Sequence, residues 1–294
     1  MRVLLTGATG FLGGHVARAL VADNHEVIVL KRRASPLTCL SSVLGHIRLH
    51  NLEDGGLRSA LGAHGRVEVV LHFATCYGGD GEPFSALLGA NVVGPLRVIE
   101  SAVQSGVSAF INADTSLPPE TNHYARAKRY FLECARQAVS GRCMRLLNMR
   151  LEHLYGPGHN NKNFISRVIH ACCSNQQYMD FTHGEQVRDF IYIDDVVAAY
   201  QRVLDLLSVG RELDPEYSVG TGLALRLRQV VELIRELSRS SIELRFGAIP
   251  YREAEPMRLV ANIEPLVQIG WSPTVSLEDG LARTIREEKK RWCS

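Results

Sequence analysis

The stretch "LLTGATGFLGGHVARAL", residues 4–20, joins an apolar run to a helical pattern through Gly7, Gly10 and Gly13. The first glycine permits a tight turn, the second lets backbone amides approach a pyrophosphate, and the third lets the helix pack closely on the strand. A merely structural turn is the alternative, but the position directly after an N-terminal strand favours a dinucleotide held at the helix N-terminus. We expect cofactor contacts at Gly7, Thr9, Gly10, Phe11, Leu12 and Gly13.

Strand-like and helical patterns alternate around this turn through the first 150 residues. Apolar runs lie at 2–6, 26–30, 47–50, 67–74, 109–112 and 144–151, and helical patterns lie at 11–23 and 84–104. Continuous apolar strands alternating with helices predict a doubly wound parallel sheet of the Rossmann type, in the α/β class. The later part mixes shorter strands with helices and predicts a smaller C-terminal α/β substrate domain. We expect the first domain to comprise 1–153 with 187–210, and the second 154–186 with 211–294.

Composition narrows the classes of partner. The chain has 294 residues, 46% of them hydrophobic and 22% charged, with a net charge of +2 and no blocks of like charge, which argues against nucleic acid. The longest apolar runs are too short to span a membrane and no secretory signal begins the chain, so we expect a cytoplasmic protein. The seven cysteines lack C-x-x-C spacing, which argues against disulfides and zinc and predicts mostly buried thiols.

The end of the second predicted strand is basic. "VIVLKRRAS", residues 27–35, has no carboxylate that would accept hydrogen bonds from the ribose of NAD. The side chains of Lys31, Arg32, Arg33 and Ser35 are instead suited to a 2′-phosphate, which favours NADP(H). The alternative is a solvated basic loop.

Tyr124 and Lys128 lie four residues apart in "TNHYARAKRY", residues 121–130, and share one face of a predicted helix. We expect the lysine ammonium to lower the pKa of the phenol and make it a usable acid or base. The strand "AFINADTS", residues 109–116, ends just upstream, where a parallel sheet presents ligand-binding groups. Thr115 is expected to bind a substrate carbonyl oxygen that Tyr124 protonates, while Lys128 contacts the nicotinamide ribose. Capping of a turn is the alternative for Thr115 and Ser116.

Two further motifs are given structural interpretations. Asp194 and Asp195 precede "VVAAY" and are interpreted as helix N-cap residues rather than metal ligands, so no metal site is expected. His72, at the end of the fourth strand, is interpreted as a hydrogen-bonded core histidine with no catalytic role.

Nearly the whole chain resembles the extended short-chain dehydrogenase/reductase family that acts on nucleotide sugars. The resemblance rests on "TGATGFLGG", "LHFAT", Asn91 in "NVVG", "ADTS", "YARAK", "YGPG" at 155–158 and "VRDFIYIDDVV" at 187–197. It implies a Rossmann domain with a smaller C-terminal substrate domain, and catalytic roles for Thr115, Tyr124 and Lys128. It also implies a homodimer through the helix over 86–103 and the helix that follows Tyr124. Further implied cofactor contacts are Asn51, Leu52, Phe73, Ala74, Thr75 and Asn91.

Within this family, four segments look most like the CDP-linked 3,6-dideoxyhexose synthases, the class of CDP-abequose and CDP-paratose synthases. They are "HFATCYG" at 72–78, "FINADTSLP" at 110–118, "RLEHLYGPG" at 150–158 and "GEQVRDFIYIDDVV" at 184–197. The resemblance implies NADPH-dependent reduction at C4 of a CDP-4-keto-3,6-dideoxyhexose, towards sugars of surface polysaccharides such as O-antigen. Family dehydratases carry Asp-Glu after the catalytic threonine, whereas Ser116 and Leu117 stand here, which argues against dehydration.

The expected substrate contacts follow partly from arginine chemistry, because a guanidinium binds phosphate oxygens bidentately. Arg188 resembles the family's phosphate-binding arginine, Arg252 matches a second one more loosely, and Arg258 is a weaker third. His153 replaces a family asparagine. Thr75, Ser116 and His153 complete the expected substrate contacts. Two alternative functions stay open: a nucleotide-sugar 4-epimerase with tightly bound NAD, and a catalytically silent dinucleotide sensor.

Overall fold

The structure is a computed structural model that describes residues 1–79, 82–158, 163–174 and 176–293. Its described side chains end at Arg291. Residues group into two compact units, Met1–Arg150 with Tyr200–Tyr217, and Leu151–Ala199 with Ser218–Ser294. Segment 187–199, which the sequence assigned to the first domain, is grouped with the second unit.

A seven-stranded sheet organises the first unit, in the order β11-β6-β5-β4-β1-β2-β3. Strands β1 and β2, β2 and β3, β1 and β4, and β4 and β5 pair in parallel, as the sequence predicted. The chain order reverses between β1 and β4, and such a switch point is where open α/β sheets bind ligands, at the carboxyl ends of the strands. The strands are β1 Arg2–Thr6, β2 Glu26–Lys31, β3 Ile47–Asn51, β4 Val69–His72, β5 Ala109–Thr115, β6 Arg145–Leu151 and β11 Glu216–Val219.

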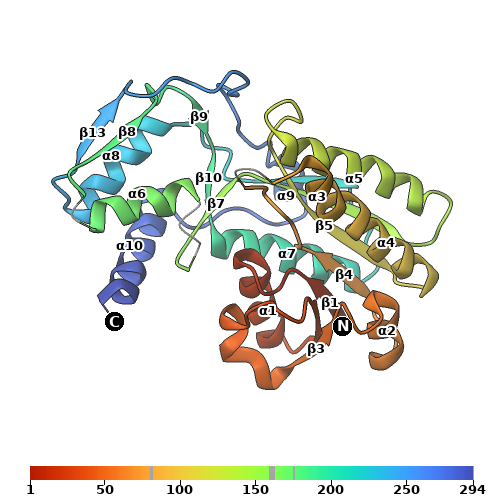
Figure 1. Cartoon of the computed structure of the whole chain (residues 1–294). Helices are drawn as coiled ribbons and strands as arrows, with labels where there is room; N and C mark the ends of the chain where they lie inside the picture. Colours follow the sequence, from red (N-terminus) through yellow and green to blue (C-terminus); the bar gives the residue numbers. More distant parts are fainter. Residues whose placement is uncertain (80–81, 159–162, 175, 294) are drawn as a thin grey trace. The chain divides into compact units, whose positions relative to one another are not determined.

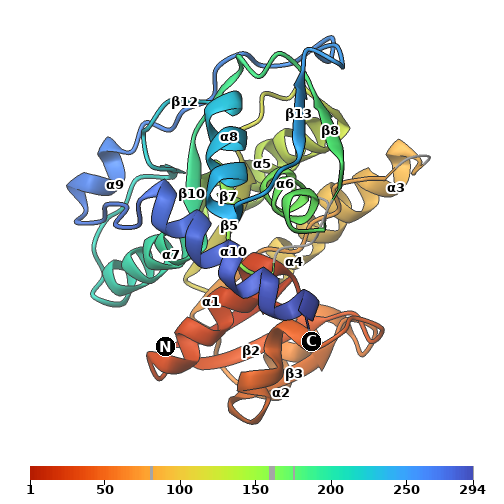
Figure 2. The same cartoon turned by 90° about the vertical axis from the view of Figure 1, so that its left-hand side faces the viewer.

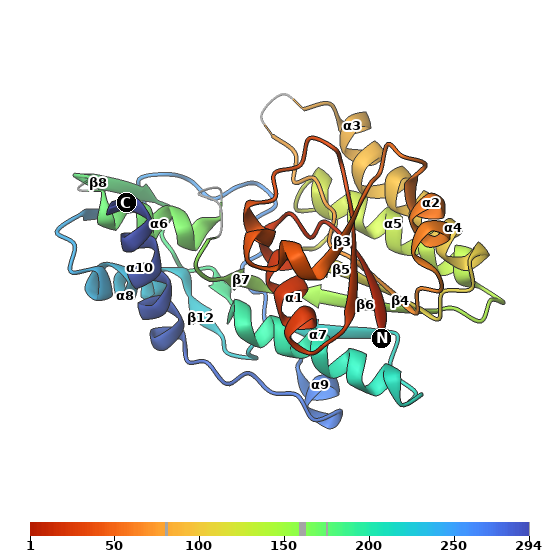
Figure 3. The same ribbon diagram turned by 90° about the horizontal axis from the view of Figure 1, so that it is seen from below.

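Helices cover both faces of this sheet, as Figures 1 and 3 show, with α2, α4 and α5 on one face and α1 on the other. Leu4, Val70 and Phe110 of the strands pack with Ile99 of α4 and Phe131 of α5 in one buried cluster. Burial on both faces explains the continuous apolar strands. The helices of this unit are α1 Phe11–Ala22, η1 Thr38–His46, α2 Gly56–His64, α3 Phe84–Leu88, η2 Gly89–Val93, α4 Gly94–Gln104 and α5 His123–Val139.

The helical segment Phe84–Gln104 is long and apolar enough, by length and composition, to cross a membrane, with a mean hydropathy of 1.3 over its best window. The sequence analysis had considered only shorter apolar runs. Val98, Ile99 and Ala102 of α4 are buried in the hydrophobic core cluster that this helix forms with the sheet. Packing in a protein core therefore explains why these positions of the helix are apolar.

The second unit combines small strand pairs with packed helices. Figure 2 shows α6, α8 and α10 packed together, with β8 and β13 as a parallel pair beside them. The β7 and β10 strands pair in parallel, and β9 and β12 pair antiparallel. The elements are β7 His153–Tyr155, α6 Phe164–Cys173, β8 Tyr178–Phe181, β9 Val187–Arg188, β10 Phe190–Tyr192, α7 Ile193–Ser208, β12 Leu225–Arg226, α8 Leu227–Ser238, β13 Glu243–Phe246, α9 Glu264–Gln268 and α10 Leu277–Cys293.

The N-cap interpretation of Asp194 and Asp195 is wrong, because α7 begins at Ile193 and places both in its first turn. Carboxylates there still complement the helix dipole. The Asp195 carboxylate also accepts hydrogen bonds from the backbone N–H groups of Thr274, at 2.9 Å, and Val275, at 3.1 Å. It therefore ties the start of α7 to the segment before α10.

Candidate active site

The glycine turn has no room for side chains. Gly7 has φ +73°, and a Cβ there would lie 2.4 Å from the backbone nitrogen of Ala74. A Cβ on Gly13 would lie 2.4 Å from the carbonyl oxygen of Gly7. The Gly10 amide donates to that same oxygen at 3.0 Å, and Gly10 is the N-cap of α1 without a capping side chain in the described structure. The bare turn fits the approach of a pyrophosphate to a helix N-terminus.

Two acidic side chains form hydrogen bonds and an ion pair with the basic loop after β2. Lys31 Nζ donates to the carbonyl oxygens of Arg32, at 3.0 Å, and Arg33, at 3.2 Å. The Arg33 guanidinium pairs with Asp54 at 2.5 Å, and its backbone N–H donates to the Glu53 carboxylate. Both carboxylates follow β3, about twenty positions later in the chain, so the sequence around Arg33 gives no sign of them. They partly neutralise the positive charge expected to attract a 2′-phosphate.

Other predicted cofactor contacts near this loop are exposed or locally bonded. Arg32 is exposed, Ser35 donates its N–H to the Arg32 carbonyl at 3.0 Å, and Leu52 is 45% exposed. Asn51 Nδ2 donates to Asp54 Oδ2 at 2.9 Å. This bond lowers the pKa of the Asp54 carboxyl, desolvation opposes the shift, and the charge and hydrogen bond of Arg33 lower the pKa further. The carboxylate is therefore ionised at neutral pH. Arg32 and Arg33 are both exposed, and Arg33 is paired with Asp54.

Asn91 holds the loop that follows β4. Its side-chain oxygen accepts from Thr75 Oγ1 at 3.1 Å and from the Cys76 N–H at 2.8 Å, and its Nδ2 donates to the Cys76 carbonyl at 2.6 Å. Asn91 is 2% exposed. Its amide is thus committed to positioning the segment that contains the predicted contacts Phe73, Ala74 and Thr75.

His72 has the environment expected of a core histidine. Its Nδ1 lies 2.7 Å from Thr6 Oγ1, and its ring stacks on Phe110. Burial, and to a smaller extent the charge of Lys128, lowers the pKa of His72 to about 3. The ring is therefore neutral at physiological pH, in agreement with the structural interpretation.

Tyr124 and Lys128 share one face of α5, as predicted. Asn122 caps the helix by accepting from the Ala125 N–H at 2.8 Å, so Tyr124 stands in the first turn. Lys128 is 4% exposed, and its Nζ donates to the carbonyl of Ala113 in β5 at 2.5 Å. The capped helix and the strand end thus bring the predicted proton donor and its partner to the carboxyl edge of the sheet.

The expected lowering of the Tyr124 pKa is not what this structure shows. Burial raises the pKa of Tyr124 well above its usual value, and the neighbouring Tyr77 and Asp114 raise it further, while a hydrogen bond with Thr75 lowers it. Burial also lowers the pKa of Lys128, which Asp114 partly offsets. The expectation failed because it counted only the lysine and left out desolvation. At neutral pH the phenol keeps its proton.

Thr115 ends β5 and also shapes the turn that follows. Its Oγ1 accepts from the Leu117 N–H at 3.2 Å, as the turn-capping alternative requires. This bond uses an oxygen lone pair and not the hydroxyl proton. Capping and binding of a carbonyl oxygen are therefore compatible roles. Ser116, also a predicted contact, is 8% exposed.

A buried polar network underlies this strand end. Asp114 Oδ1 accepts from the Thr115 N–H at 2.8 Å, and its Oδ2 accepts from Asn148 Nδ2 at 2.9 Å. Asn112 Nδ2 donates to Asn148 Oδ1 at 2.8 Å. The sequence analysis missed this network, although two polar residues within an apolar strand were a usable signal.

In the second unit, Arg188 is almost fully buried. It is 4% exposed, pairs through Nη2 with Glu255 Oε1, and donates from Nη1 to its neighbour Val187 at 2.8 Å. Burial lowers the pKa of its guanidinium and Glu255 opposes this shift. Arg252 and Arg258 are exposed. A phosphate contact from Arg188 thus requires exchange of the Glu255 carboxylate for a phosphate.

His153 and Asp189 organise the same part of this unit. His153 Nδ1 lies 3.8 Å from the Glu152 carboxylate, and its ring packs near Phe190. Asp189, with no exposed surface, accepts backbone N–H bonds from Thr221 at 2.8 Å and Gly222 at 2.9 Å. Sequence reasoning singled out Arg188 and overlooked this neighbouring carboxylate.

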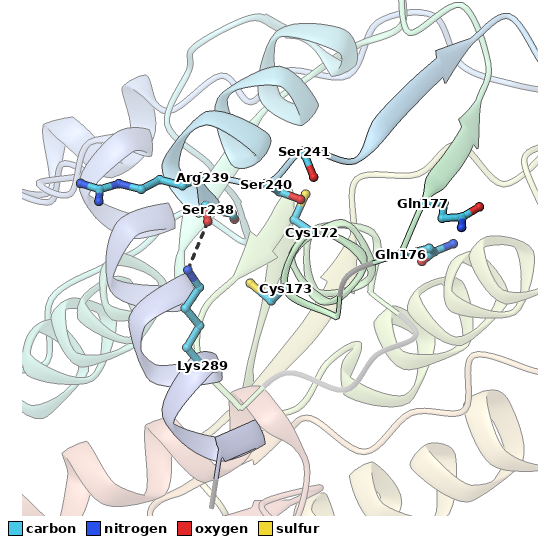
Figure 4. Close-up of a pocket in the computed structure, with 9 residues that line it drawn as sticks. All are labelled: Cys172, Cys173, Gln176, Gln177, Ser238, Arg239, Ser240, Ser241 and Lys289. Carbon is cyan, nitrogen blue, oxygen red and sulfur yellow. Dashed lines mark hydrogen bonds between the residues drawn. The ribbon is translucent and has the colours of Figure 1, made fainter.

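The second unit also holds a polar pocket of about 330 Å³ between the carboxyl ends of α6 and α8 (Figure 4). Cys172, Cys173 and Ser238 line it, and Lys289 Nζ donates to the Ser238 carbonyl at 3.2 Å. Burial raises the pKa of Cys172 to about 11, so this thiol is protonated and unreactive. None of the predicted site residues lines the pocket.

The expectation of mostly buried thiols is wrong. Among the six cysteines whose side chains are described, all are free and only Cys172 is buried, while Cys143 is exposed. The described residues contain no group of three or more His, Cys, Asp or Glu side chains that could hold a metal ion.

Comparisons with known proteins agree with this geometry. The pattern of the NAD dependent epimerase/dehydratase family matches residues 3–220. A CDP-abequose synthase of Salmonella muenchen is 32% identical over 293 residues, which cover 97% of each chain. The structure of MoeE5 in complex with UDP-glucose and NAD is similar, with a TM-score of 0.85, 26% identity and all of both chains covered. A UDP-glucose 4-epimerase of Thermotoga maritima shares the fold, with a TM-score of 0.86, 23% identity, and 99% and 100% of the chains covered.

The matched range, residues 3–220, spans most of the chain and contains the glycine turn, Thr115, Tyr124 and Lys128. These findings support an enzyme of the oxidoreductase type with a Rossmann fold. The chain belongs to the NAD dependent epimerase/dehydratase family.

Proposed function

We propose that the protein reduces the C4 ketone of a CDP-linked 4-keto-3,6-dideoxyhexose with NADPH, as a step in the biosynthesis of a deoxysugar for surface polysaccharide. The observation that carries the proposal is the capped first turn of α5, which sets Tyr124 one helical turn before the buried Lys128 and close to the end of β5. Family membership and the likeness to a CDP-abequose synthase support a nucleotide-sugar-modifying enzyme.

The residues of the first unit fit a nicotinamide dinucleotide. The turn at Gly7, Gly10 and Gly13 leaves space for a pyrophosphate. We propose that Lys128, whose Nζ donates to the Ala113 carbonyl in β5, contacts the nicotinamide ribose. A nicotinamide cofactor held there would supply the hydride that C4 of the sugar receives. Tyr124 gives its proton to the C4 oxygen, which Thr115 orients, so the ketone becomes an alcohol. The raised pKa of Tyr124 suits this step, because the phenol must carry a proton before each turnover.

The preference for NADPH rests on Arg32 with Lys31 and Ser35, since Arg33 is paired with Asp54. The contacts to the diphosphate of CDP that we propose in the second unit are Arg188, Arg252 and His153. Thr75 and Ser116 are the proposed contacts to the sugar in the first unit. Arginine forks suit diphosphate oxygens.

The test supplies purified protein with CDP-4-keto-3,6-dideoxyglucose and follows NADPH absorbance, with NMR of the product to identify the new alcohol. We expect NADPH oxidation at a higher kcat/KM than NADH oxidation. Tyr124→Phe should lower turnover by about 100-fold or more, because the proton donor is lost. NADPH binding, measured by fluorescence titration, should change little. Near-normal turnover in this variant would refute the assignment of Tyr124.

A 4-epimerase is the second candidate, and the carboxylates near Arg33 favour it. Glu53 and Asp54 reduce the positive charge at the end of β2, and the similar MoeE5 is complexed with NAD. An epimerase would retain NAD through purification and would interconvert C4 epimers without net oxidation of NADPH. The same assay therefore separates the two candidates.

The third alternative is a catalytically silent sensor, which would bind the cofactor without converting either sugar. The presence of Thr115, Tyr124 and Lys128 argues against it.

A further inference from the structure

Tyr77 lies against the proposed proton donor. Its ring centroid is 4.9 Å from that of Tyr124, and the ring planes are tilted by 42°. The side chain of Tyr77 is nevertheless 66% exposed, so it covers Tyr124 without being buried itself. No part of the proposed reduction uses this second phenol.

The backbone around Tyr77 is held in place. Cys76, the residue before Tyr77, is bonded to the Asn91 side chain twice: the Cys76 N–H donates to Asn91 Oδ1, and Asn91 Nδ2 donates to the Cys76 carbonyl. The following residue, Gly78, has φ +75°, and a Cβ there would lie 2.8 Å from Leu87 Cδ1 in α3. The hydrogen bonds from Asn91 thus hold the residue directly before Tyr77, and the conformation of Gly78 favours glycine directly after it.

A second aromatic contact joins the same part of the chain to α5. The Phe84 ring lies 4.5 Å from the ring of His123, the first residue of that helix. Tyr77 and Phe84 thus each contact an aromatic residue in the first turn of α5, Tyr124 and His123.

A ketone oxygen that receives a proton from Tyr124 must lie about 2.6–3.2 Å from its hydroxyl. The two carbons that flank C4 are two bonds from that oxygen, and our inference places them beside the Tyr77 ring, because this ring contacts the ring of Tyr124. In a 3,6-dideoxy sugar, one of these carbons is the C3 methylene and the other bears the C6 methyl group. Both are apolar, and an aromatic face is a suitable surface for them.

We propose that Tyr77 is a specificity-determining residue whose ring selects sugars that lack the C3 hydroxyl. This inference rests on the proposed function and adds a reason for the choice of substrate. A C3 hydroxyl against the ring would lose hydrogen bonds to water without gaining a good partner, whereas a methylene would be buried favourably. The enzyme would thus distinguish the two sugars by the substituent on C3, the carbon next to the one that is reduced.

The experiment compares kcat/KM for CDP-4-keto-3,6-dideoxyglucose and CDP-4-keto-6-deoxyglucose, which differ only in the C3 hydroxyl. The wild type should prefer the dideoxy sugar by about tenfold or more, the range typical of one group in an apolar pocket. Tyr77→Ala removes the ring and should bring this ratio close to one. Tyr77→Phe keeps the ring and should leave the ratio within about threefold of the wild type.

Two further variants test whether the change in the ratio is caused by loss of the Tyr77 ring. Tyr77→Gln replaces the ring by a smaller side chain with hydrogen-bonding groups, so it should also bring the ratio closer to one. It tests the inference independently if Tyr77→Ala fails to fold. Tyr178→Ala, at a 42% exposed tyrosine in β8, should leave the ratio unchanged. NADPH affinity serves as the measure of an intact first unit in every variant.

The possible failures can be told apart. If the wild type reduces neither sugar, the proposed function is wrong and this inference falls with it. If it reduces the dideoxy sugar but the ratio survives in both Tyr77→Ala and Tyr77→Gln, only the inference is wrong. Loss of turnover in Tyr77→Phe comparable to that in Tyr124→Phe would make Tyr77 a proton donor and would equally overturn a role in selection.

Discussion

His72 illustrates how a single side chain can make stability depend on pH. Its pKa is lowered from 6.5 to about 3, so the folded protein resists its protonation while the unfolded chain does not. The stability associated with neutral His72 is present above pH 6.5 and is lost as the pH falls towards 3. The largest slope for one such group is about 1.4 kcal/mol per pH unit.

We therefore expect His72→Asn to be less sensitive to acid than the wild type, even if it is less stable at pH 7.5. Urea unfolding of both proteins at pH 7.5 and pH 5 measures the difference, because all other titrating groups are shared. A wild type and a variant that lose equal free energy of unfolding between these pH values would show that His72 is not protonated on unfolding.

Tyr124 shows which part of the site the sequence could predict. The spacing of Tyr124 and Lys128 fixed their common helix face, since residues four apart always lie close on a helix. The direction of the phenol's pKa shift was not predictable from that spacing. It depends on burial and on Tyr77 and Asp114, which other elements bring to the helix. Local periodicity carries no information on such long-range neighbours.

At the scale of elements, local sequence predicts the strands but not the contacts made by the loops that follow them. The strands β1, β2 and β5 were predictable because their apolar runs are continuous and both of their faces are buried. The acidic residues Glu53 and Asp54 were not expected beside Arg33, because the register of β2 with β3 brings the two strand ends together. This register depends on the pairing of strands that are distant in sequence, so it cannot be predicted from the local pattern of either strand.

The end of β5 depends on the buried carboxylate of Asp114. We expect Asp114→Asn to lower the free energy of unfolding by about 1–3 kcal/mol. The reason is that an amide nitrogen would face either the Thr115 N–H or the Asn148 amide, both of which are donors. Equilibrium urea unfolding measures the change.

The matched control for this variant is Asp205→Asn, which alters an exposed carboxylate in the same unit. It should change stability by no more than about 0.5 kcal/mol. Equal effects of the two substitutions would show that the network beneath β5 contributes nothing specific to the fold.

At the scale of the whole molecule, the assembly proposed from the sequence is a homodimer through α4 and α5. Val93 in η2 is 47% exposed and Tyr130 in α5 is 44% exposed, and η2 contacts both helices. Large apolar side chains that remain exposed on adjacent helices favour association with a second copy. Two copies would cover this surface by a symmetric contact.

We predict that light scattering after size exclusion gives twice the chain mass of 32.6 kDa for the wild type. Val93→Asp should shift the mass towards that of one chain, because a desolvated carboxylate is costly at an apolar interface. Val209→Asp supplies the control, since Val209 is more exposed, at 76%, but lies just after α7 and away from the proposed interface in sequence. A single-chain mass for the wild type, or equal dissociation by both substitutions, would count against α4 and α5 as the dimer helices.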